Sequence, residues 1–420
     1  MASSDPTAAP YTRSPNCRIC GHSELAPVLS LGRQPLANKV LKTSVAVGPE
    51  PRVPLDVVHC PHCSLVQLTA TVDPAHLFRH YLYFSSQAQT MLDHARDMVT
   101  DLTQELGLGP EHFVIEIASN DGYLLRNFVQ RGIPALGIEP ARNIAARAEA
   151  LGVSTLAEFF DMGLARRLAT EGRRADLIIA NNVIAHVADL HGVMEGVREL
   201  LKPSGVAVFE FQYIGGLIET CAFDTIYHEH LCYFSATAFE YLLRQHGLAA
   251  WAITPQSTHG GSLRVHAVAA AGAPASPKAV KDFLAGERRA GIFDTSHYTG
   301  FAKRTDDIIR RSRELLLRLR GEGLRMAGYA AAAKCTVMLN ALGLDADTVT
   351  PIADRSPYKQ GHLIPGLRVP IVSPEAMLAQ APDVIVIFAW NIAAEIMESL
   401  DDYRRGGGRF LVLIPEPRLT

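Results

Sequence analysis

The stretch Val114-Ile115-Glu116-Ile117-Ala118-Ser119-Asn120-Asp121-Gly122-Tyr123 decides the fold. Its first four residues continue an apolar run of strand length, the next five form a turn of small and polar residues, and helical sequence follows. A second apolar run at residues 135–139 precedes an alanine-rich helical stretch that reaches Leu151. Strands that alternate with helices at this spacing are typical of a parallel sheet covered by helices.

The same alternation continues on both sides of a break in the chain. Residues 176–180 and 206–210 are further strand candidates, so we expect a doubly wound parallel sheet before the break. Small residues and prolines at 271–277 mark a domain boundary, and a long amphipathic helix at about 298–319 leads into a second alternation of strands and helices. We predict an α/β protein of three domains: a cysteine-rich domain at 1–80, a Rossmann-like domain at 81–270 and a smaller, C-terminal Rossmann-like domain at 271–420.

The composition is that of an ordinary globular protein. Of 420 residues, 48 % are hydrophobic and 20 % are charged, and the formal net charge of −3 gives no reason to expect nucleic acid or an anionic membrane as a partner. The first fifteen residues lack the apolar core of a signal peptide, and the longest apolar stretch, at 384–390, is too short to span a bilayer. We therefore expect a soluble, cytoplasmic protein.

Four of the seven cysteines form two Cys-x-x-Cys turns near the start of the chain, Cys17 with Cys20 and Cys60 with Cys63. The two-residue spacing lets each turn supply two sulfurs to one ion, and four thiolates complete a tetrahedral zinc site. Because no position then stays open for water or substrate, we expect the zinc to be structural. The alternative is a set of unrelated buried or redox-active thiols.

The turn after the first strand is a candidate cofactor site. A ligand there would meet backbone N–H groups and the N-terminus of the following helix. Glu116 ends the first strand and Glu139 ends the second, where a carboxylate can accept both hydroxyls of a ribose. Both nicotinamide dinucleotides and S-adenosylmethionine carry such a ribose. The turn has one glycine where a dinucleotide fingerprint has three, so these residues leave both cofactors open, as well as a tight turn with two solvated acids.

The motifs together resemble those of the zinc-containing sugar C-methyltransferases of deoxysugar biosynthesis, and the likeness covers nearly the whole chain. It departs from the family at Ala118, where glycine is usual, and at 330–333, where glycine and proline are common. The segments that carry it are the two cysteine turns, Leu31–Leu36, Glu116–Leu125, Asn181–His186, Tyr227–His230, His259–Arg264, Gly328–Lys334 and Asp354–Gly361.

The resemblance implies S-adenosylmethionine and zinc as cofactors and a nucleotide-linked 4-keto sugar as substrate. It makes residues 81–270 the methyltransferase domain. The residues it places at the cofactor are Glu116, Ala118, Asn120, Asp121, Gly122, Glu139 and Asn181. The residues it places at the sugar are His186, Tyr227, Glu229 and His230.

The second group suits chemistry at a carbon next to a ketone. That carbon becomes nucleophilic only after it loses a proton, and the enolate oxygen then needs stabilisation. We predict that His230 is the base, that Glu229 orients this histidine or the sugar, and that Tyr227 and His186 contact the oxyanion or a hydroxyl. Without the family likeness, the sequence Tyr-His-Glu-His would be interpreted as the polar start of a helix.

Further substrate contacts are predicted on both sides of the reaction site. Tyr81 and Tyr83 are candidates to line the substrate cleft, although packing explains two aromatic residues equally well. In the C-terminal domain, Lys334, Asp354 and Lys359 follow strand ends and suit the phosphates and base of a nucleotide. A packing domain with surface lysines is the alternative.

The predicted activity is therefore methyl transfer from S-adenosylmethionine to a ring carbon of a nucleotide-linked 4-keto deoxysugar. We expect dTDP as the nucleotide, C3 as the carbon, direct displacement onto the enolate, and a monomer that binds its substrate between the two Rossmann-like domains. The rival functions are a sugar O- or N-methyltransferase, an NAD-dependent sugar oxidoreductase and a non-enzymatic zinc-ribbon scaffold.

Overall fold

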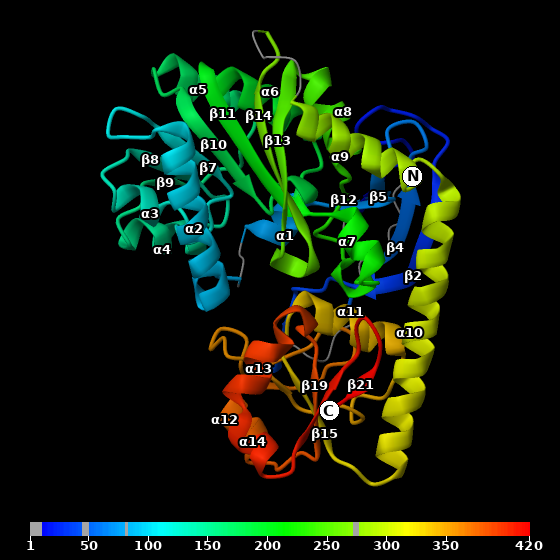
Figure 1. Ribbon diagram of the computed structural model, residues 1–420. Coiled ribbons are helices and arrows are strands. Elements are labelled where there is room, and N and C mark those ends of the chain that lie inside the picture. Colours follow the sequence, from blue (N-terminus) through cyan, green and yellow to red (C-terminus); the bar gives the residue numbers. More distant parts are fainter. Residues whose placement is uncertain (1–10, 44–49, 80–82, 272–276) are drawn as a thin grey trace.

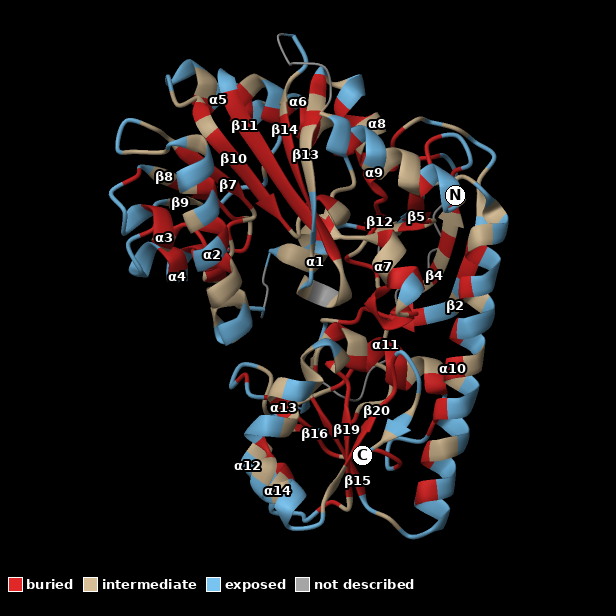
Figure 2. Ribbon diagram, viewed as in Figure 1, coloured by how far each residue is buried: buried red, intermediate tan, exposed pale blue. Residues whose placement is uncertain are grey.

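The computed structural model describes residues 11–43, 50–79, 83–271 and 277–420 of the chain. Three sheets of four or more strands organise these residues, one for each predicted domain (Figure 1). Figure 2 shows that the strands are mostly buried, whereas the outer faces of the surrounding helices are exposed. Among the described residues, no helix is long and apolar enough to cross a membrane.

The largest sheet has seven strands in the order β13-β14-β11-β10-β7-β8-β9. The five strands from β11 to β9 are parallel, but β14 runs antiparallel to both of its neighbours. The four predicted strands, β7, β8, β10 and β11, are parallel as expected. The antiparallel strand β14 was not predicted, and the short connection at 257–261 joins it to β13 as a hairpin. The bounds are β7 Val114–Ile117, β8 Ala135–Ile138, β9 Thr155–Leu156, β10 Ala175–Asn181, β11 Leu201–Gln212, β13 Leu248–Gln256 and β14 Ser262–Ala269.

Helices cover both faces of this sheet because its strands are apolar on both faces. Ile115 and Ile178 pack in one hydrophobic cluster, whereas Val114 and Leu177 pack in another on the opposite face. The helices are α2 Gln89–Leu106, α3 Arg126–Val129, α4 Arg142–Ala150, α5 Met162–Thr170, α6 Leu190–Leu200, α8 Ala236–Gln245 and α9 Lys278–Arg289.

The cysteine-rich part contains a four-stranded antiparallel sheet in the order β12-β5-β4-β2. Three of its strands are local, but β12 comes from residues 232–233, directly after the Tyr227–His230 motif. The bounds are β2 Ala26–Pro35, β4 Arg52–His59, β5 Val66–Leu68 and β12 Cys232–Tyr233.

The C-terminal part has a six-stranded sheet in the order β18-β16-β15-β19-β20-β21, parallel except for β21. The predicted second Rossmann-like domain is confirmed. Its elements are β15 Met326–Tyr329, α11 Ala333–Leu342, β16 Ile352–Ala353, β18 Ile371–Val372, α12 Pro374–Leu378, β19 Val384–Ile387, α13 Ala393–Ser399, α14 Asp401–Arg405, β20 Arg409–Val412 and β21 Arg418–Leu419.

Two helices connect the large sheet to the C-terminal sheet. Helix α9 packs against α8 and β13, where Glu287 accepts hydrogen bonds from the backbone N–H groups of Ala236 and Thr237. Helix α10 (Thr295–Gly321) then runs along the side of the molecule, against β2 and α11 (Figure 1). The domain limits at 80/81 and 270/271 stay predictions, since α9 lies beyond the second limit but against the large sheet.

The parallel strands of the seven-stranded sheet and those of the six-stranded sheet point toward each other, so that their carboxyl ends face across the middle of the molecule (Figure 1). In each sheet the strand order reverses at one point, between β7 and β10 in the large sheet and between β15 and β19 in the C-terminal sheet. Ligands of open α/β sheets bind at such points, outside the carboxyl ends of the strands. The fold therefore directs two candidate binding sites toward each other.

Candidate active site and zinc site

The four predicted zinc ligands lie together. All four sulfur atoms are within 4.8 Å of one another, and Cys17 Sγ lies 3.4 Å from Cys63 Sγ while Cys20 Sγ lies 3.5 Å from Cys60 Sγ. Zinc held by sulfur at about 2.3 Å in a tetrahedron needs sulfur atoms about 3.8 Å apart, so the four thiolates fit the ion. The antiparallel pairing of β2 with β4, in which Ala26 lies opposite His59, brings the two cysteine turns together.

The cysteine-rich part of the chain contacts the Tyr227–His230 motif and holds it in place. His228 is buried, and its Nε2 donates to the backbone carbonyl of Val53 at 3.1 Å. Asn38 Nδ2 donates to Glu229 Oε1 at 3.2 Å, and β12 then pairs with β5. A structural metal in this part therefore helps to fix residues that lie far from it in sequence.

The turn after β7 holds a buried carboxylate in one orientation. Glu139 is 6 % exposed, its Oε2 accepts from the Asn120 N–H at 3.0 Å, and its Oε1 accepts from the Ala141 N–H at 2.8 Å. Burial raises the pKa of Glu139 to about 7, although the two backbone N–H groups oppose that rise. The turn needs left-handed backbone at Ala118, where φ is +53°, and at Gly122, where φ is +76°.

Several buried polar atoms around this turn have no hydrogen-bond partner among the described residues: Glu116 Oε2, Ser119 Oγ, Asp121 Oδ1 and Asn181 Oδ1. Buried polar atoms are normally paired, so an unpaired group at the point where the strand order reverses fits a polar ligand. Burial, followed by the charges of Glu139 and Asp121, raises the pKa of Glu116 well above its usual value. S-adenosylmethionine, with its ribose and amino acid groups, is a ligand that these donors and acceptors suit.

The segment before α2 is attached to the same turn. The Ser85 N–H donates to Asn120 Oδ1 at 2.9 Å, Asn120 Nδ2 donates to the Tyr83 carbonyl at 3.2 Å, and the Ser86 hydroxyl donates to Asp121. Tyr83 itself is 42 % exposed. Tyr81 lies outside the described residues.

Three of the four residues predicted to act on the sugar form a ring cluster. The His230 and Tyr227 rings are 4.0 Å apart, and the His230 and His186 rings are 4.8 Å apart. His230 Nδ1 lies 2.9 Å from the Thr225 carbonyl, which can only accept, so Nδ1 carries a proton and the lone pair of the neutral ring is on Nε2. Burial lowers the pKa of His186 to about 4, which makes it neutral at pH 7.

Glu229 lies in the same motif but in a different environment. Its carboxyl is 2 % exposed, Oε1 accepts from Asn38, and Oε2 has no hydrogen-bond partner among the described residues. Burial raises the pKa of Glu229. The role predicted for Glu229, to orient either this histidine or the sugar, stays a prediction, and the His230 ring is held by the Thr225 carbonyl. A backbone carbonyl has no sequence signature, so no pattern could have predicted it.

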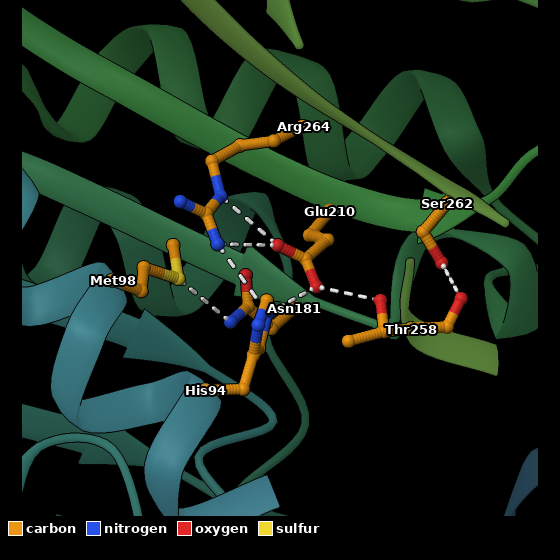
Figure 3. A network of polar contacts seen from close by, with 7 residues as sticks. All are labelled: His94, Met98, Asn181, Glu210, Thr258, Ser262 and Arg264. Atoms are coloured by element: carbon orange, nitrogen blue, oxygen red, sulfur yellow. Dashed lines mark hydrogen bonds and ion pairs between the residues drawn. The ribbon is translucent and has the colours of Figure 1, made fainter. Parts of the chain in front are cut away.

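A buried polar network that the sequence motifs did not predict lies at the ends of β10, β11 and β14 (Figure 3). Glu210 accepts from His94 Nε2 at 2.7 Å and from the Arg264 guanidinium at 2.9 Å, and Thr258 lies within 3.4 Å. Met98 of the same helix as His94 contacts Asn181. Burial raises the pKa of Glu210, but His94 and Arg264 outweigh it, so the pKa lies below its usual value. An acid inside the apolar run of β11 was the available signal.

The predicted nucleotide contacts separate into two groups in the C-terminal sheet. Lys359 Nζ donates to the Ala331 carbonyl at 2.9 Å and lies 3.5 Å from Asp354, which also accepts from the Ser356 N–H. Lys334 is apart from them and donates to Asn391 at 2.6 Å. Each of these three side chains therefore has a partner within the chain.

Three families match consecutive parts of the chain: a zinc binding domain at residues 17–78, a methyltransferase domain at 91–253 and a C-methyltransferase C-terminal domain at 257–415. C-methyltransferase NovU from Streptomyces niveus is 38 % identical over 403 residues, which is 96 % of each chain. A ubiquinone biosynthesis O-methyltransferase from Azorhizobium caulinodans is 26 % identical over 96 residues, which is 23 % of this chain and 38 % of that protein.

Among solved structures, the magnesium protoporphyrin IX methyltransferase from Synechocystis PCC 6803 with bound S-adenosylhomocysteine is 16 % identical, with a TM-score of 0.35, over 42 % of this chain and 83 % of that one. The likeness to NovU extends over all three parts of the fold. The four-cysteine site and the methyltransferase domain assign zinc and S-adenosylmethionine as cofactors. The chain belongs to the family of zinc-containing, S-adenosylmethionine-dependent C-methyltransferases.

Proposed function

We propose that this enzyme methylates C3 of a dTDP-linked 4-keto deoxysugar, after it removes the proton next to the ketone. The observation that carries the proposal is the tautomer of His230. Its Nδ1 proton is engaged by the Thr225 carbonyl, so the basic lone pair is on Nε2 of a ring that lies beside Tyr227 and His186. A neutral histidine with a fixed tautomer is suited to accept a proton from carbon.

The groups around His230 suit the charge that develops during this reaction. Removal of the proton places negative charge on the ketone oxygen, where hydrogen-bond donors stabilise it. The Tyr227 hydroxyl is one donor, and neutral His186 is a second, because its low pKa prevents it from competing for the proton. A buried Glu229 with a raised pKa suits a hydrogen bond to a sugar hydroxyl.

S-adenosylmethionine supplies the electrophilic methyl group that the enolate carbon attacks. We propose that Glu139 binds its ribose and that the turn at 118–122, with Glu116 and Asn181, binds the rest of the cofactor. The pairing of Glu139 with two backbone N–H groups supports this, since it directs the carboxylate before the ligand binds. We also propose that the C-terminal domain holds the nucleotide, because the carboxyl ends of its strands face those of the methyltransferase sheet.

Deuterium exchange separates proton removal from methyl transfer. The probe is dTDP-4-keto-6-deoxyglucose in deuterated buffer with S-adenosylhomocysteine, so that no methyl group is available. Wild-type enzyme should exchange the C3 hydrogen, and His230→Ala should lose exchange by at least about a hundredfold, the scale of a general base. His112→Ala, at a half-buried histidine in the loop before β7, is the matched control.

Two outcomes would refute the proposal. If His230→Ala exchanges hydrogen at the wild-type rate, another group removes the proton. If NMR of the methylated product places the new methyl group on C5, oxygen or nitrogen, the assigned position or the enolate mechanism is wrong.

A further inference from the structure

The turn that orients His230 is itself held by the C-terminal domain. Asp224 directly precedes Thr225 in the short helix η4 (Phe223–Thr225), and its side chain is 1 % exposed. Trp390, which follows β19, donates its Nε1 hydrogen to both carboxylate oxygens of Asp224, at 3.0 and 3.2 Å. Trp390 is therefore linked to the His230 imidazole, which we propose as the base, through Asp224 and the carbonyl of the next residue, Thr225.

The indole ring has little freedom to move. Lys334 Nζ lies 4.5 Å from the centre of the Trp390 ring and also donates to Asn391. Gly260 also approaches the ring edge so closely that a Cβ at this position would lie 2.4 Å from Trp390 Cη2. Helix α11, which carries Lys334, packs against η4. These contacts fix the direction of the indole N–H.

A buried carboxylate needs such a partner. Burial raises the pKa of Asp224 to about 6, whereas the charge of Lys334 and the hydrogen bond from Trp390 lower it, so the group is largely ionised at pH 7. An ionised carboxylate that loses its donor either moves or takes up a proton. Either change would disturb η4, in which the residue after Asp224, Thr225, directs its carbonyl to His230.

We propose that Trp390 and Asp224 are positioning residues that hold the His230 imidazole in its reactive orientation, so that the C-terminal domain contributes to proton removal as well as to substrate binding. The location of Trp390 supports this, because it lies where the strand order of the C-terminal sheet reverses. A nucleotide bound there would contact Lys334 and the aromatic face of residue 390, both of which Trp390→Phe keeps. The inference rests on the proposed role of His230.

The test is a double-mutant cycle on the zinc-loaded, full-length enzyme. Trp390→Phe keeps an aromatic ring but removes the N–H, and Asp224→Ala removes the acceptor. Both should lower C3 exchange of dTDP-4-keto-6-deoxyglucose and kcat about tenfold, the scale of a modest misplacement of a catalytic group. Three other quantities should each change less than about twofold, as expected where the substituted residue and the measured site are independent. They are KM for the sugar nucleotide, S-adenosylmethionine affinity by calorimetry, and zinc content.

The cycle distinguishes positioning from a general loss of stability. Because Trp390 acts through Asp224, the double variant should be no slower than Asp224→Ala alone, and Asp224→Asn, which keeps an acceptor oxygen, should recover most of the exchange rate. Trp251→Phe on β13 is the matched control, since Trp251 is the other tryptophan of the chain and lies beside His266. It should leave the exchange rate unchanged.

Three results would overturn the inference. The first is an unchanged exchange rate in Trp390→Phe, and the second is a decrease in the double variant equal to the product of the two single decreases. The third is an equal decrease of the exchange rate in Asp224→Asn and Asp224→Ala. Failure of the proposed function is recognised separately, through His230→Ala. If His230→Ala loses exchange while Trp390→Phe keeps it, only the positioning role falls. If His230→Ala keeps exchange, the base itself is misassigned.

Discussion

The raised pKa of Glu139 leads to a pH dependence of cofactor binding that can be worked out from the structure. The carboxyl is 6 % exposed, and burial raises its pKa from 4.5 to about 7. For the ligand-free protein, this raised pKa favours the protonated form, so the stability that Glu139 contributes below pH 4.5 is lost as the pH rises through 7. The affinity for S-adenosylmethionine should instead rise with pH. An ionised carboxylate can accept hydrogen bonds from both ribose hydroxyls, whereas a protonated carboxyl carries an O–H that occupies one of these positions.

The size of the effect follows from the ionised fraction. With a pKa of about 7, roughly a tenth of Glu139 is ionised at pH 6 and roughly nine tenths at pH 8. The apparent Kd for S-adenosylmethionine should therefore be about tenfold weaker at pH 6 than at pH 8, or about 1.4 kcal/mol. Glu139→Gln cannot ionise, so it should lose this slope and bind more weakly at pH 8 by about 1–3 kcal/mol.

Isothermal titration calorimetry at pH 6, 7 and 8 measures both quantities. The amino group of the ligand also titrates near this range, but it does so equally for wild type and Glu139→Gln, so the difference between the two slopes isolates the carboxylate. Identical slopes for the two proteins would show that Glu139 does not ionise on binding. Identical affinities at pH 8 would remove Glu139 from the cofactor site.

Three further outcomes are expected. Ala118→Gly should stabilise the protein by about 0.5–1 kcal/mol in urea unfolding, because Ala118 has a φ of +53°; no gain would refute strain at the turn. Cys17→Ser should lose zinc by metal analysis and unfold more easily, since zinc binding energy is also folding energy; a stable, active, zinc-free variant would contradict a structural metal. Arg264→Met should cost about 3–5 kcal/mol at pH 7, because it leaves buried Glu210 without its cation. Because the pKa of Glu210 is lowered in the folded protein, the stability that its carboxylate contributes is present above pH 4.5 and is lost as the pH falls below that value. The free energy of unfolding of Arg264→Met should therefore fall less on acidification than that of the wild type. Equal decreases would contradict the ion pair.

The parts of the fold that follow from local pattern were predictable from the sequence. The strand at 114–117 and the helix at 142–150 lie where the apolar run and the alanine-rich stretch predict them. The antiparallel strand β14 was not predicted, because its direction depends on a hairpin with β13 rather than on its own residues. Four cysteines at fixed spacing predicted the metal site, since zinc chemistry restricts both ligand type and distance.

The candidate active site could be predicted only as a set of residue types. The sequence indicates His230 and Tyr227 as candidates, and their rings lie 4.0 Å apart. It could not identify Thr225, which acts through its backbone, or Asn38, which reaches Glu229 from 191 residues away. Glu210 gave a detectable signal, a carboxylate inside an apolar strand, but its partners His94 and Arg264 lie on two other elements.

These differences have a common physical cause. A reacting side chain must be of a particular chemical type, so selection of that type leaves a trace in the sequence. A residue that orients it needs only a donor or acceptor at the right point in space, and any part of the fold can supply that. In this protein the turn after β2 supplies Asn38 to Glu229, the turn at η4 supplies the Thr225 carbonyl to His230, and the C-terminal domain supplies Trp390 to Asp224. If His230 is the base, three separate parts of the chain must fold before it is correctly placed, which gives a physical reason for a methyltransferase to retain a metal that has no position open for substrate.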